Sequence, residues 1–421
     1  MPNIVPASIA FKFASDWIPR LGESLLQQRK ARLHEIDQMA DIFGDPIELG
    51  NFYIEPHCQQ FNPADDDEEE ARYVVREPIF SRLQHFFGGA TVTGGNQLFV
   101  LADAGMGKTS LLMMLKMAYV SSFWPKAFEC ILLKLGPDSL TEINKITSRR
   151  NKILLLDALD EDPSSWGRIT QYLTQLLAAT RTFRRVVITC RTQFFSGNED
   201  PFNRRGQVSL SGYVCPVIYL SLFDEEQVEE YLKKRFPGAK DSIHLAKRML
   251  AKIRSLRCRP MLLAHIEDML QSESTAWSEF SIYEALIKTW LQREQRKMGE
   301  RQQAVAPTIN DLWSACRFVS VELHRRGKRE LDEESLNIFI KLNPLIHHIP
   351  TMDIGGRSLL NKNSKGEFRF SHYSIQEFMI ADSVIRGLEG NALGQIRPTD
   401  QSIAFILQSQ DYRNFCLTGE A

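Results

Sequence analysis

A glycine-rich segment between an apolar run and a helix-length stretch restricts the fold of this chain more than any other feature. The segment reads Ala-Asp-Ala-Gly-Met-Gly-Lys-Thr-Ser and covers Ala102 to Ser110. The apolar residues before it, Leu98–Leu101, predict a strand, and the stretch Ser110–Tyr119 predicts a helix. Glycines allow the backbone N–H groups of such a loop to wrap a phosphate at the N-terminus of the following helix. The sequence therefore predicts a phosphate-binding loop between a strand and a helix.

The segment departs from the strict P-loop pattern, GxxxxGK followed by Ser or Thr, because Ala102 stands where a glycine is usual. Even with alanine allowed there, ordinary composition gives roughly 0.03 chance matches in a chain of this length. In this pattern Lys108 reaches the β- and γ-phosphates, and the Thr109 hydroxyl ligates Mg²⁺. We therefore expect ATP or ADP with Mg²⁺ as the ligand. The residues of the loop predicted to bind the nucleotide are Ala102, Asp103, Ala104, Gly105, Met106, Gly107, Lys108, Thr109 and Ser110.

A second motif, Ile153–Asp157, reads as a buried strand that ends in a carboxylate. In a P-loop protein this aspartate completes the Mg²⁺ shell through water, so Thr109 and Asp157 are the predicted metal residues. Asp160 and Glu161 follow the end of the strand, where a carboxylate can orient or deprotonate the attacking water. The choice between these two catalytic candidates is open, and a plain polar loop is the alternative.

A third motif, Val186–Arg191, is an apolar strand that ends in an arginine. Arg191 is a catalytic candidate because it would lie beside the γ-phosphate if its strand neighbours the strand before the loop. An arginine after a strand is otherwise an ordinary surface residue. The order of the strands decides between these readings.

Short β-rich runs alternate with helix-length segments between residues 97 and 222. This alternation predicts an α/β fold with a parallel sheet covered by helices on both faces. Past Phe223 the pattern is helical to Arg296, and Thr308–Gly387 mixes helices with a β-like pair around Ser358–Phe370. The predicted strands are Gln97–Leu101, Cys130–Leu135, Lys152–Asp157, Arg185–Cys190 and Val217–Leu222.

Taken together, these motifs resemble the NACHT group of STAND signalling ATPases over about Val74 to Ala381. The resemblance implies that a proline in the lid helices contacts the base, and Pro260 in Arg257–Leu262 matches it. It also implies a winged-helix histidine that touches the β-phosphate in the closed, ADP-bound state, and His372 in Phe368–Phe378 matches that residue. The segments that carry the resemblance besides these are Ala102–Ser110, Ile153–Glu161, Thr189–Arg191 and Tyr219–Asp224.

The resemblance and the composition of the chain imply five segments. Residues 1–70 form a helical region with an acidic linker at Asp65–Glu70, and residues 71–223 form the P-loop nucleotide-binding domain. Residues 224–300 form a helical lid and residues 301–391 a winged-helix domain. Residues 392–421 are a tail or the start of a sensor. The fold class is thus a P-loop sheet flanked by helices, followed by a lid and a winged helix.

The function implied by the resemblance is a slow, Mg²⁺-dependent ATPase that acts as a switch. It holds ADP when closed, and a signal lets it take ATP and oligomerise. The trigger, protein or nucleic acid, and the effector are not specified, and bacterial relatives imply a role in antiviral defence.

Three alternatives belong to other classes. The first is a steadily cycling AAA-type ATPase that acts on nucleic acid or protein. The second is a P-loop kinase, faintly suggested by Arg254, Arg257 and Arg259. The third is a scaffold that binds nucleotide without hydrolysing it.

Charge and cysteine content limit the partners and the cellular compartment that we expect for this chain. The formal net charge is -1, with 51 basic and 52 acidic residues, which predicts no strong overall attraction to nucleic acid or anionic membranes. The seven cysteines are scattered without a CxxC pair, which argues against a disulfide framework and a zinc site. Met1–Trp17 lacks the apolar core of a signal peptide, and no run reaches the ~18 to 20 apolar residues of a membrane span. We therefore expect a cytoplasmic protein without a membrane partner.

Overall fold

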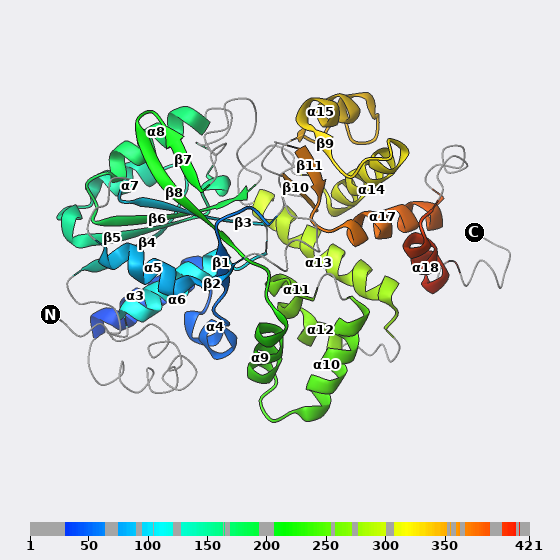
Figure 1. Ribbon diagram of the computed structural model, residues 1–421, viewed down its shortest axis with the longest axis horizontal. Helices are drawn as coiled ribbons and strands as arrows, with labels where there is room; N and C mark the ends of the chain where they lie inside the picture. The colour runs from blue at the N-terminus through cyan, green and yellow to red at the C-terminus, as the bar shows by residue number, and fades with distance from the viewer. Residues whose placement is uncertain are drawn as a thin grey trace. The chain divides into compact units, whose positions relative to one another are not determined.

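The structure of the chain is a computed structural model that divides into two compact units (Figure 1). The described residues up to Gly238 form the first unit, and those from Ala239 onward form the second. The residues that the structure describes are 30–63, 75–89, 95–103, 105–120, 128–162, 164, 169–192, 206–253, 257–271, 277–299, 307–351, 354, 359–362, 367–387, 398–409 and 412.

The first unit is built on one sheet with the strand order β2-β1-β8-β3-β6-β5-β4, and β7 pairs with β8. Strands β8, β3, β6, β5 and β4 run parallel to one another, as the alternating sequence pattern predicts. Strands β1, β2 and β7 are antiparallel additions. The bounds are β1 His57–Gln59, β2 Glu77–Pro78, β3 Gln97–Ala102, β4 Glu129–Lys134, β5 Lys152–Asp157, β6 Arg185–Arg191, β7 Gln207–Leu210 and β8 Tyr213–Leu220.

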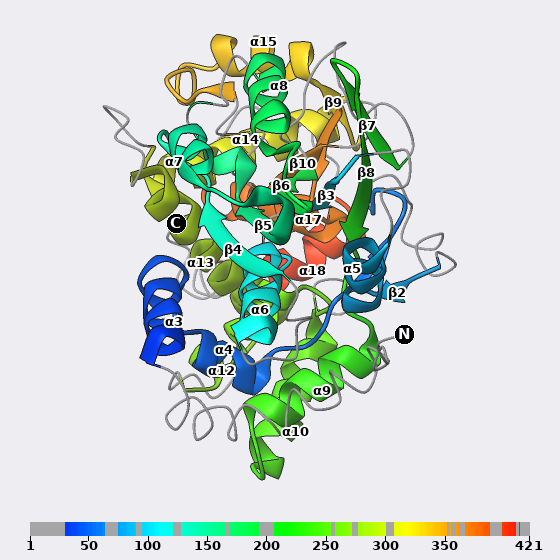
Figure 2. The same cartoon turned by 90° about the vertical axis from the view of Figure 1, so that its left-hand side faces the viewer.

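Helices cover both faces of this sheet, because every residue of β3 is buried and its successive side chains point to opposite faces. In β3, Leu98 and Val100 pack with the helices α3 (Lys30–Phe43), α5 (Ile79–Gly88) and α6 (Lys108–Val120). Phe99 and Leu101 point to the other face and pack with α7 (Ser139–Lys145) and α8 (Ile169–Thr180). Figures 1 and 2 show these helix layers on the two sides of the sheet. The predicted fold class is confirmed for this unit.

The first unit extends beyond the predicted limits of the nucleotide-binding domain at residues 71 and 223. On the N-terminal side, β1 pairs with β8, and Glu35 of α3 forms an ion pair with Lys116 of α6. On the C-terminal side, Gln227 of α9 (Glu225–Arg235) donates a hydrogen bond to the Glu55 carbonyl over 2.6 Å. The segment after Gly44 is the helix α4 (Pro46–Phe52), capped by Asp45. The acidic run Asp65–Glu70 lies outside the described residues.

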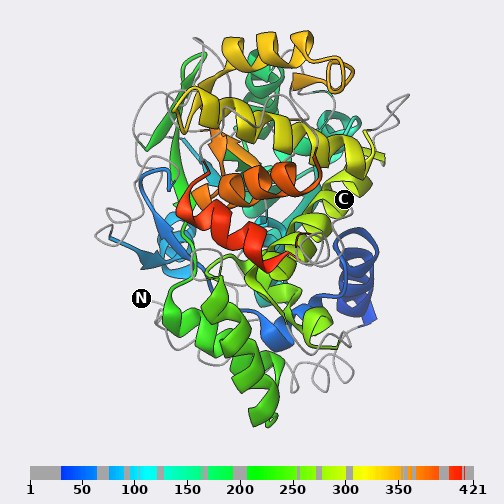
Figure 3. The same cartoon turned by 90° about the vertical axis from the view of Figure 1, so that its right-hand side faces the viewer.

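The second unit consists of helices and a small antiparallel sheet in the order β10-β11-β9 (Figure 3). Its elements include, in chain order, helix α14, strand β9, helix α15 and the strand pair β10 and β11, and this pair falls within the predicted range Ser358–Phe370. The assignment as a winged helix stays a prediction. Helix α17 packs on α14 and α18 around Tyr283, Phe378 and Phe405. The bounds are α10 Lys240–Lys252, α11 Pro260–Ala264, α12 Ile266–Gln271, α13 Glu279–Gly299, α14 Ile309–Arg325, β9 Leu331–Asp332, α15 Glu333–Leu342, β10 Leu360–Lys362, β11 Glu367–Phe370, α17 Tyr373–Ile385 and α18 Asp400–Gln408.

None of the helices in the described part of the chain combines the length and apolar character needed to cross a bilayer. The cysteines within the described ranges are free thiols.

Candidate active site

The loop between β3 and α6 has the backbone that the sequence pattern requires. Gly105 and Gly107 have φ angles of 75° and 84°, in the left-handed region that favours glycine. A Cβ atom added to Gly107 would meet nothing within 4 Å, so the backbone conformation requires this glycine and packing does not. Helix α6 then begins with a hydrogen bond of 2.8 Å from the Leu111 amide to the Gly107 carbonyl. Ala104 lies outside the described residues.

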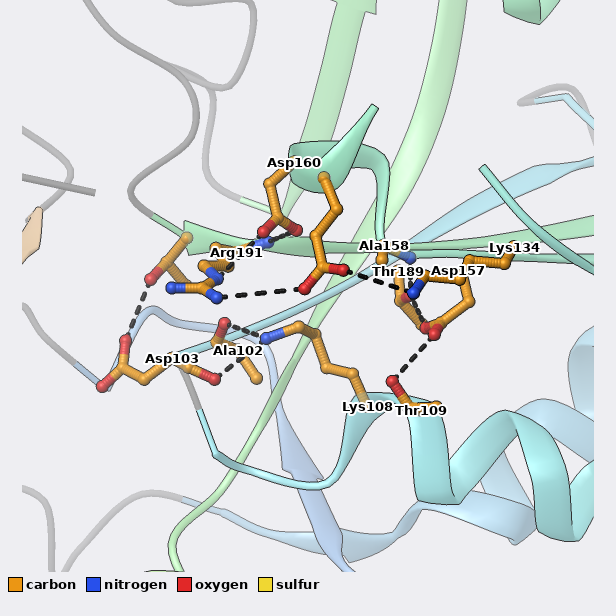
Figure 4. A network of polar contacts seen from close by, with 12 residues as sticks. Ala102, Asp103, Lys108, Thr109, Lys134, Asp157, Ala158, Asp160, Thr189 and Arg191 are labelled. Atoms are coloured by element: carbon orange, nitrogen blue, oxygen red, sulfur yellow. Dashed lines mark hydrogen bonds and ion pairs between the residues drawn. The ribbon is translucent and has the colours of Figure 1, made fainter. Parts of the chain in front are cut away.

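The two side chains that follow the loop glycines contact the loop and the end of β5. The Lys108 ammonium donates hydrogen bonds to the carbonyl oxygens of Ala102 and Asp103, at 2.8 and 2.9 Å. The Thr109 hydroxyl donates to Oδ2 of Asp157 over 2.7 Å (Figure 4). The predicted lysine therefore lies against the loop, and the two predicted metal residues lie in contact.

Asp157 is a buried carboxylate held by hydroxyl groups from two elements. Asp157 is the last residue of β5 and is only 2 % exposed. Its Oδ1 accepts a hydrogen bond of 2.6 Å from the Thr189 hydroxyl. Burial raises the pKa of Asp157 above its usual range, whereas the bonds from Thr189 and Thr109 lower it. No role at the site was predicted for Thr189 from sequence, although a hydroxyl within the apolar run of β6 was a usable signal.

The backbone directly after Asp157 is strained. Ala158 has a φ of 59° and a ψ of 54°, a left-handed conformation that costs a non-glycine residue about 1 to 3 kcal/mol. Its amide donates to the Thr189 hydroxyl over 3.0 Å, which helps to hold this conformation. The kink starts the short 3₁₀ turn Leu159–Glu161, which carries both predicted catalytic carboxylates.

The structure separates the environments of Asp160 and Glu161. Oδ2 of Asp160 lies 2.9 Å from Nε of Arg191, and Oδ1 accepts the Arg191 backbone N–H over 3.1 Å. The Asp160 and Arg191 side chains are only 7 % and 5 % exposed. Glu161 lies at longer ion-pair distances, 4.0 Å from Nη2 of Arg191 and 3.9 Å from Nζ of Lys134. Both carboxylate oxygens of Asp160 thus contact Arg191, while Glu161 lies between the cations of Arg191 and Lys134.

The strand order places Arg191 beside the loop. Strand β6 lies between β3 and β5, and in the parallel register Arg191 is paired with Ala102. The condition that the sequence left open is therefore met, since β6 neighbours the strand before the loop. The carboxyl ends of β3, β6, β5 and β4 bring Lys108, Arg191, Asp157 and Lys134 to one edge of the sheet, where α/β proteins bind their ligands.

This chain has the P-loop NTPase fold. Chains of similar structure include a Walker-type ATPase of Pyrococcus abyssi, 12% identical, with a TM-score of 0.39, covering 78% of this chain and 99% of that one. A RuvB variant of Thermotoga maritima is 11% identical with a TM-score of 0.33, covering 72% and 92%. The Orc1 protein of Aeropyrum pernix, solved in complex with DNA, is 14% identical with a TM-score of 0.33, covering 76% and 94%. No protein-family model and no curated protein matches the sequence. Likeness of this extent carries no argument about function, so the fold rests on the strand order and the loop.

The remaining predicted residues, Pro260 and His372, belong to the second unit. Pro260 is the first residue of α11, and Arg259 before it donates a hydrogen bond of 2.6 Å to the Ser371 carbonyl. His372 caps the N-terminus of α17, where its Nδ1 accepts the Ser374 backbone N–H over 3.0 Å. The two segments named by the family resemblance are thus joined within one unit. Their contacts to a nucleotide stay predictions.

The protein groups fit a Mg²⁺ ion that is bound chiefly by its nucleotide. In the part of the chain that the structure describes, no group of three or more His, Cys, Asp or Glu side chains is arranged to hold a metal. Mg²⁺ usually keeps several waters and takes only one or two protein ligands besides phosphate oxygens. Thr109 and Asp157 offer the hard oxygen atoms that such a site needs.

Proposed function

We propose that this chain is a Mg²⁺-dependent ATPase that acts as a nucleotide switch of the NACHT type. The observation that carries the ATPase part is the contact of Thr109 with the buried Asp157, directly after a loop with two left-handed glycines. Mg²⁺ held there would neutralise phosphate charge during hydrolysis. ATP and ADP are the ligands that this arrangement favours.

We propose Glu161 as the general base of hydrolysis. Glu161 would take a proton from the attacking water while the new bond to the γ-phosphorus forms and the bond to the oxygen that bridges to the β-phosphorus breaks, releasing ADP and phosphate. Asp160 is a poor candidate, because both of its oxygens are bound to Arg191. We assign Asp160 to positioning Arg191, which would donate to the γ-phosphate oxygens.

The switch part rests on the family resemblance. In this proposal Pro260 contacts the base and His372 contacts the β-phosphate of ADP, so that bound ADP keeps the chain closed. A signal then permits exchange for ATP and self-assembly, and bacterial members of the NACHT group suggest antiviral defence as the setting. The partner that triggers the switch is a protein or a nucleic acid.

Nucleotide alone is too weak to drive such a switch. Moving an equilibrium from 1:99 to 99:1 needs about 5.5 kcal/mol of differential binding. One charge-assisted hydrogen bond from Arg191 to a γ-phosphate supplies roughly 1.5 to 3 kcal/mol. A second input, a trigger or an oligomer interface, is therefore part of the proposal. Complete assembly of the isolated chain with ATP alone would contradict it.

The test is to purify the full chain, denature it and identify the released nucleotide by chromatography. We expect near-equimolar ADP from the unchanged protein, none from Lys108→Ala and less from His372→Ala. Lys145→Ala and His347→Ala are matched controls, because both side chains are exposed and lie outside the proposed site. An empty site, or one unaffected by His372→Ala, would contradict the closed switch.

A steadily cycling ATPase is the second candidate. It is favoured by one observation: the hydrolytic residues Lys108, Asp157, Glu161 and Arg191 all lie in the first unit. Such an enzyme would not need His372. Fast basal turnover that is unchanged in His372→Ala would support it over the switch.

A further inference from the structure

A chain of hydrogen bonds inside the second unit ends on the ring of His372. The Tyr283 hydroxyl of α13 donates to Oγ of Ser374 over 2.6 Å. Oγ of Ser374 in turn lies 2.6 Å from Nδ1 of His372. Both Tyr283 and Ser374 are buried, and the ring of Tyr283 packs on Phe378 one turn further along α17. These contacts hold the imidazole from one side.

The Ser374 backbone decides which way this chain runs. Its N–H lies 3.0 Å from Nδ1 of His372, and a backbone N–H can only donate. Nδ1 must therefore be an acceptor, which a neutral imidazole allows on one nitrogen only. Since the Ser374 hydroxyl already accepts from Tyr283, it has its own proton to give to Nδ1. The proton of the neutral ring then lies on Nε2.

The opposite arrangement is unfavourable. If Nδ1 carried the proton, it would face the Ser374 N–H, and two donors would point at each other. An unmade hydrogen bond to a buried polar group is unfavourable, and this amide lies at the first turn of α17. The chain of contacts thus selects one tautomer.

We propose that Tyr283 and Ser374 are positioning residues that hold His372 as its Nε2–H tautomer. His372 can then donate through Nε2 to an anionic oxygen without carrying a positive charge. This inference rests on the proposed function only for the identity of the acceptor, which is the β-phosphate of ADP. The tautomer itself can be measured without nucleotide.

The test is nitrogen NMR of the full chain labelled with ¹⁵N-histidine. The His372 signals are identified by their loss in His372→Asn. In the unchanged protein we expect Nδ1 to resonate as the unprotonated nitrogen and Nε2 as the protonated one. In Ser374→Ala we expect a mixture of both tautomers, because one of the two donors to Nδ1 is gone. Tyr283→Phe should have a smaller effect in the same direction, because the Ser374 hydroxyl remains.

The affinity for ADP supplies the second readout. We expect Ser374→Ala to weaken ADP binding about three- to tenfold, the effect of one hydrogen bond. Ser383→Ala is the matched control, since Ser383 is a buried serine of the same helix whose hydroxyl donates to the Met379 carbonyl. This control should change neither the tautomer nor the affinity.

The two readouts separate the inference from the proposed function. A protonated Nδ1 in the unchanged chain would overturn the inference. So would a Ser374→Ala variant with the same tautomer and ADP affinity as Ser383→Ala. If the Nε2–H tautomer is found and lost as expected while His372→Ala binds ADP normally, the positioning role is supported and the phosphate contact is contradicted.

Discussion

At the scale of single residues, the two neighbouring carboxylates Asp160 and Glu161 are expected to have different roles. Glu161→Gln should lower the turnover number about 10²- to 10⁴-fold, the range for a general base, with nucleotide binding kept. Its free energy of unfolding should change little, because its ion pairs are 3.9 Å and 4.0 Å long. Turnover and nucleotide binding of this variant are the measurements.

Asp160→Asn should instead destabilise the fold. Removing one charge of a buried ion pair leaves the other uncompensated, and we expect a loss of about 3 kcal/mol in the free energy of unfolding. Denaturant unfolding of both variants at pH 7 compares them directly. A stable but inactive Asp160→Asn beside an active Glu161→Gln would reverse the assignment of the base.

Asp157 gives a prediction about pH. The pKa of this carboxyl is higher in the folded state than in the unfolded state, so the folded state binds more protons. The free energy of unfolding therefore falls as pH rises from the unfolded-state pKa to the folded-state pKa. Asp157→Asn has no carboxyl that titrates at this position, so its stability does not fall with pH for this reason. We expect it to melt at a higher temperature than the unchanged protein at pH 7 without Mg²⁺, with the difference disappearing below the usual aspartate pKa. Melting curves against pH in a chelator measure this, and Mg²⁺-dependent turnover should be lost.

At the scale of elements, the loop between β3 and α6 depends on its backbone conformation. Gly107→Ala should weaken nucleotide binding about five- to thirtyfold, because the left-handed conformation costs an alanine roughly 1 to 2 kcal/mol although its Cβ meets no atom. Gly136→Ala is the matched control, since its added Cβ also meets nothing and its φ is not in the left-handed region. Equal nucleotide affinity in the two variants would contradict this reading of the loop.

The segment that joins α4 to β1 is expected to respond to pH. Burial raises the pKa of Glu55 from 4.5 to about 7, although its carboxylate accepts the Phe80 amide over 2.8 Å. The stabilisation is fully present below pH 4.5 and is lost as pH rises through 7. The free energy of unfolding falls by about 3 kcal/mol over this range. Glu55→Gln should raise the melting temperature at pH 8 and leave it nearly unchanged at pH 4. An equal shift at both values would show that the charge of Glu55 is not the cause.

The parallel core of the sheet could be predicted from sequence, whereas its additions could not. Buried parallel strands such as β5 read as continuous apolar runs, so their limits are visible. Strand β1, His-Cys-Gln, is short and polar in part, and it belongs to the sheet only through its pairing with β8. The roles of Thr189 and Asp160 likewise depend on β6 lying between β3 and β5, which is long-range information. The motif residues were predictable, whereas contacts such as those of Thr189 with Asp157 and of Asp160 with Arg191 were not.

At the scale of the whole molecule, the hydrolytic residues lie in one compact unit and Pro260 and His372 lie in the other. A switch needs both, because ligand binding shifts an equilibrium only through contacts that differ between its states. In the proposed account, Lys108 and Asp157 give the affinity for nucleotide, and His372 makes the affinity depend on the state. Turnover should then be limited by ADP release and not by the chemical step.

The rate at which the chain releases a fluorescent ADP analogue tests this account most directly. The measurement follows displacement by excess unlabelled ADP with Mg²⁺, in the unchanged protein and in His372→Ala, beside the His347→Ala control. The account predicts slow release that matches the turnover number, and release about three- to tenfold faster in His372→Ala alone. Fast release that is equal in all three proteins, with turnover limited by hydrolysis, would contradict the switch and leave a cycling ATPase.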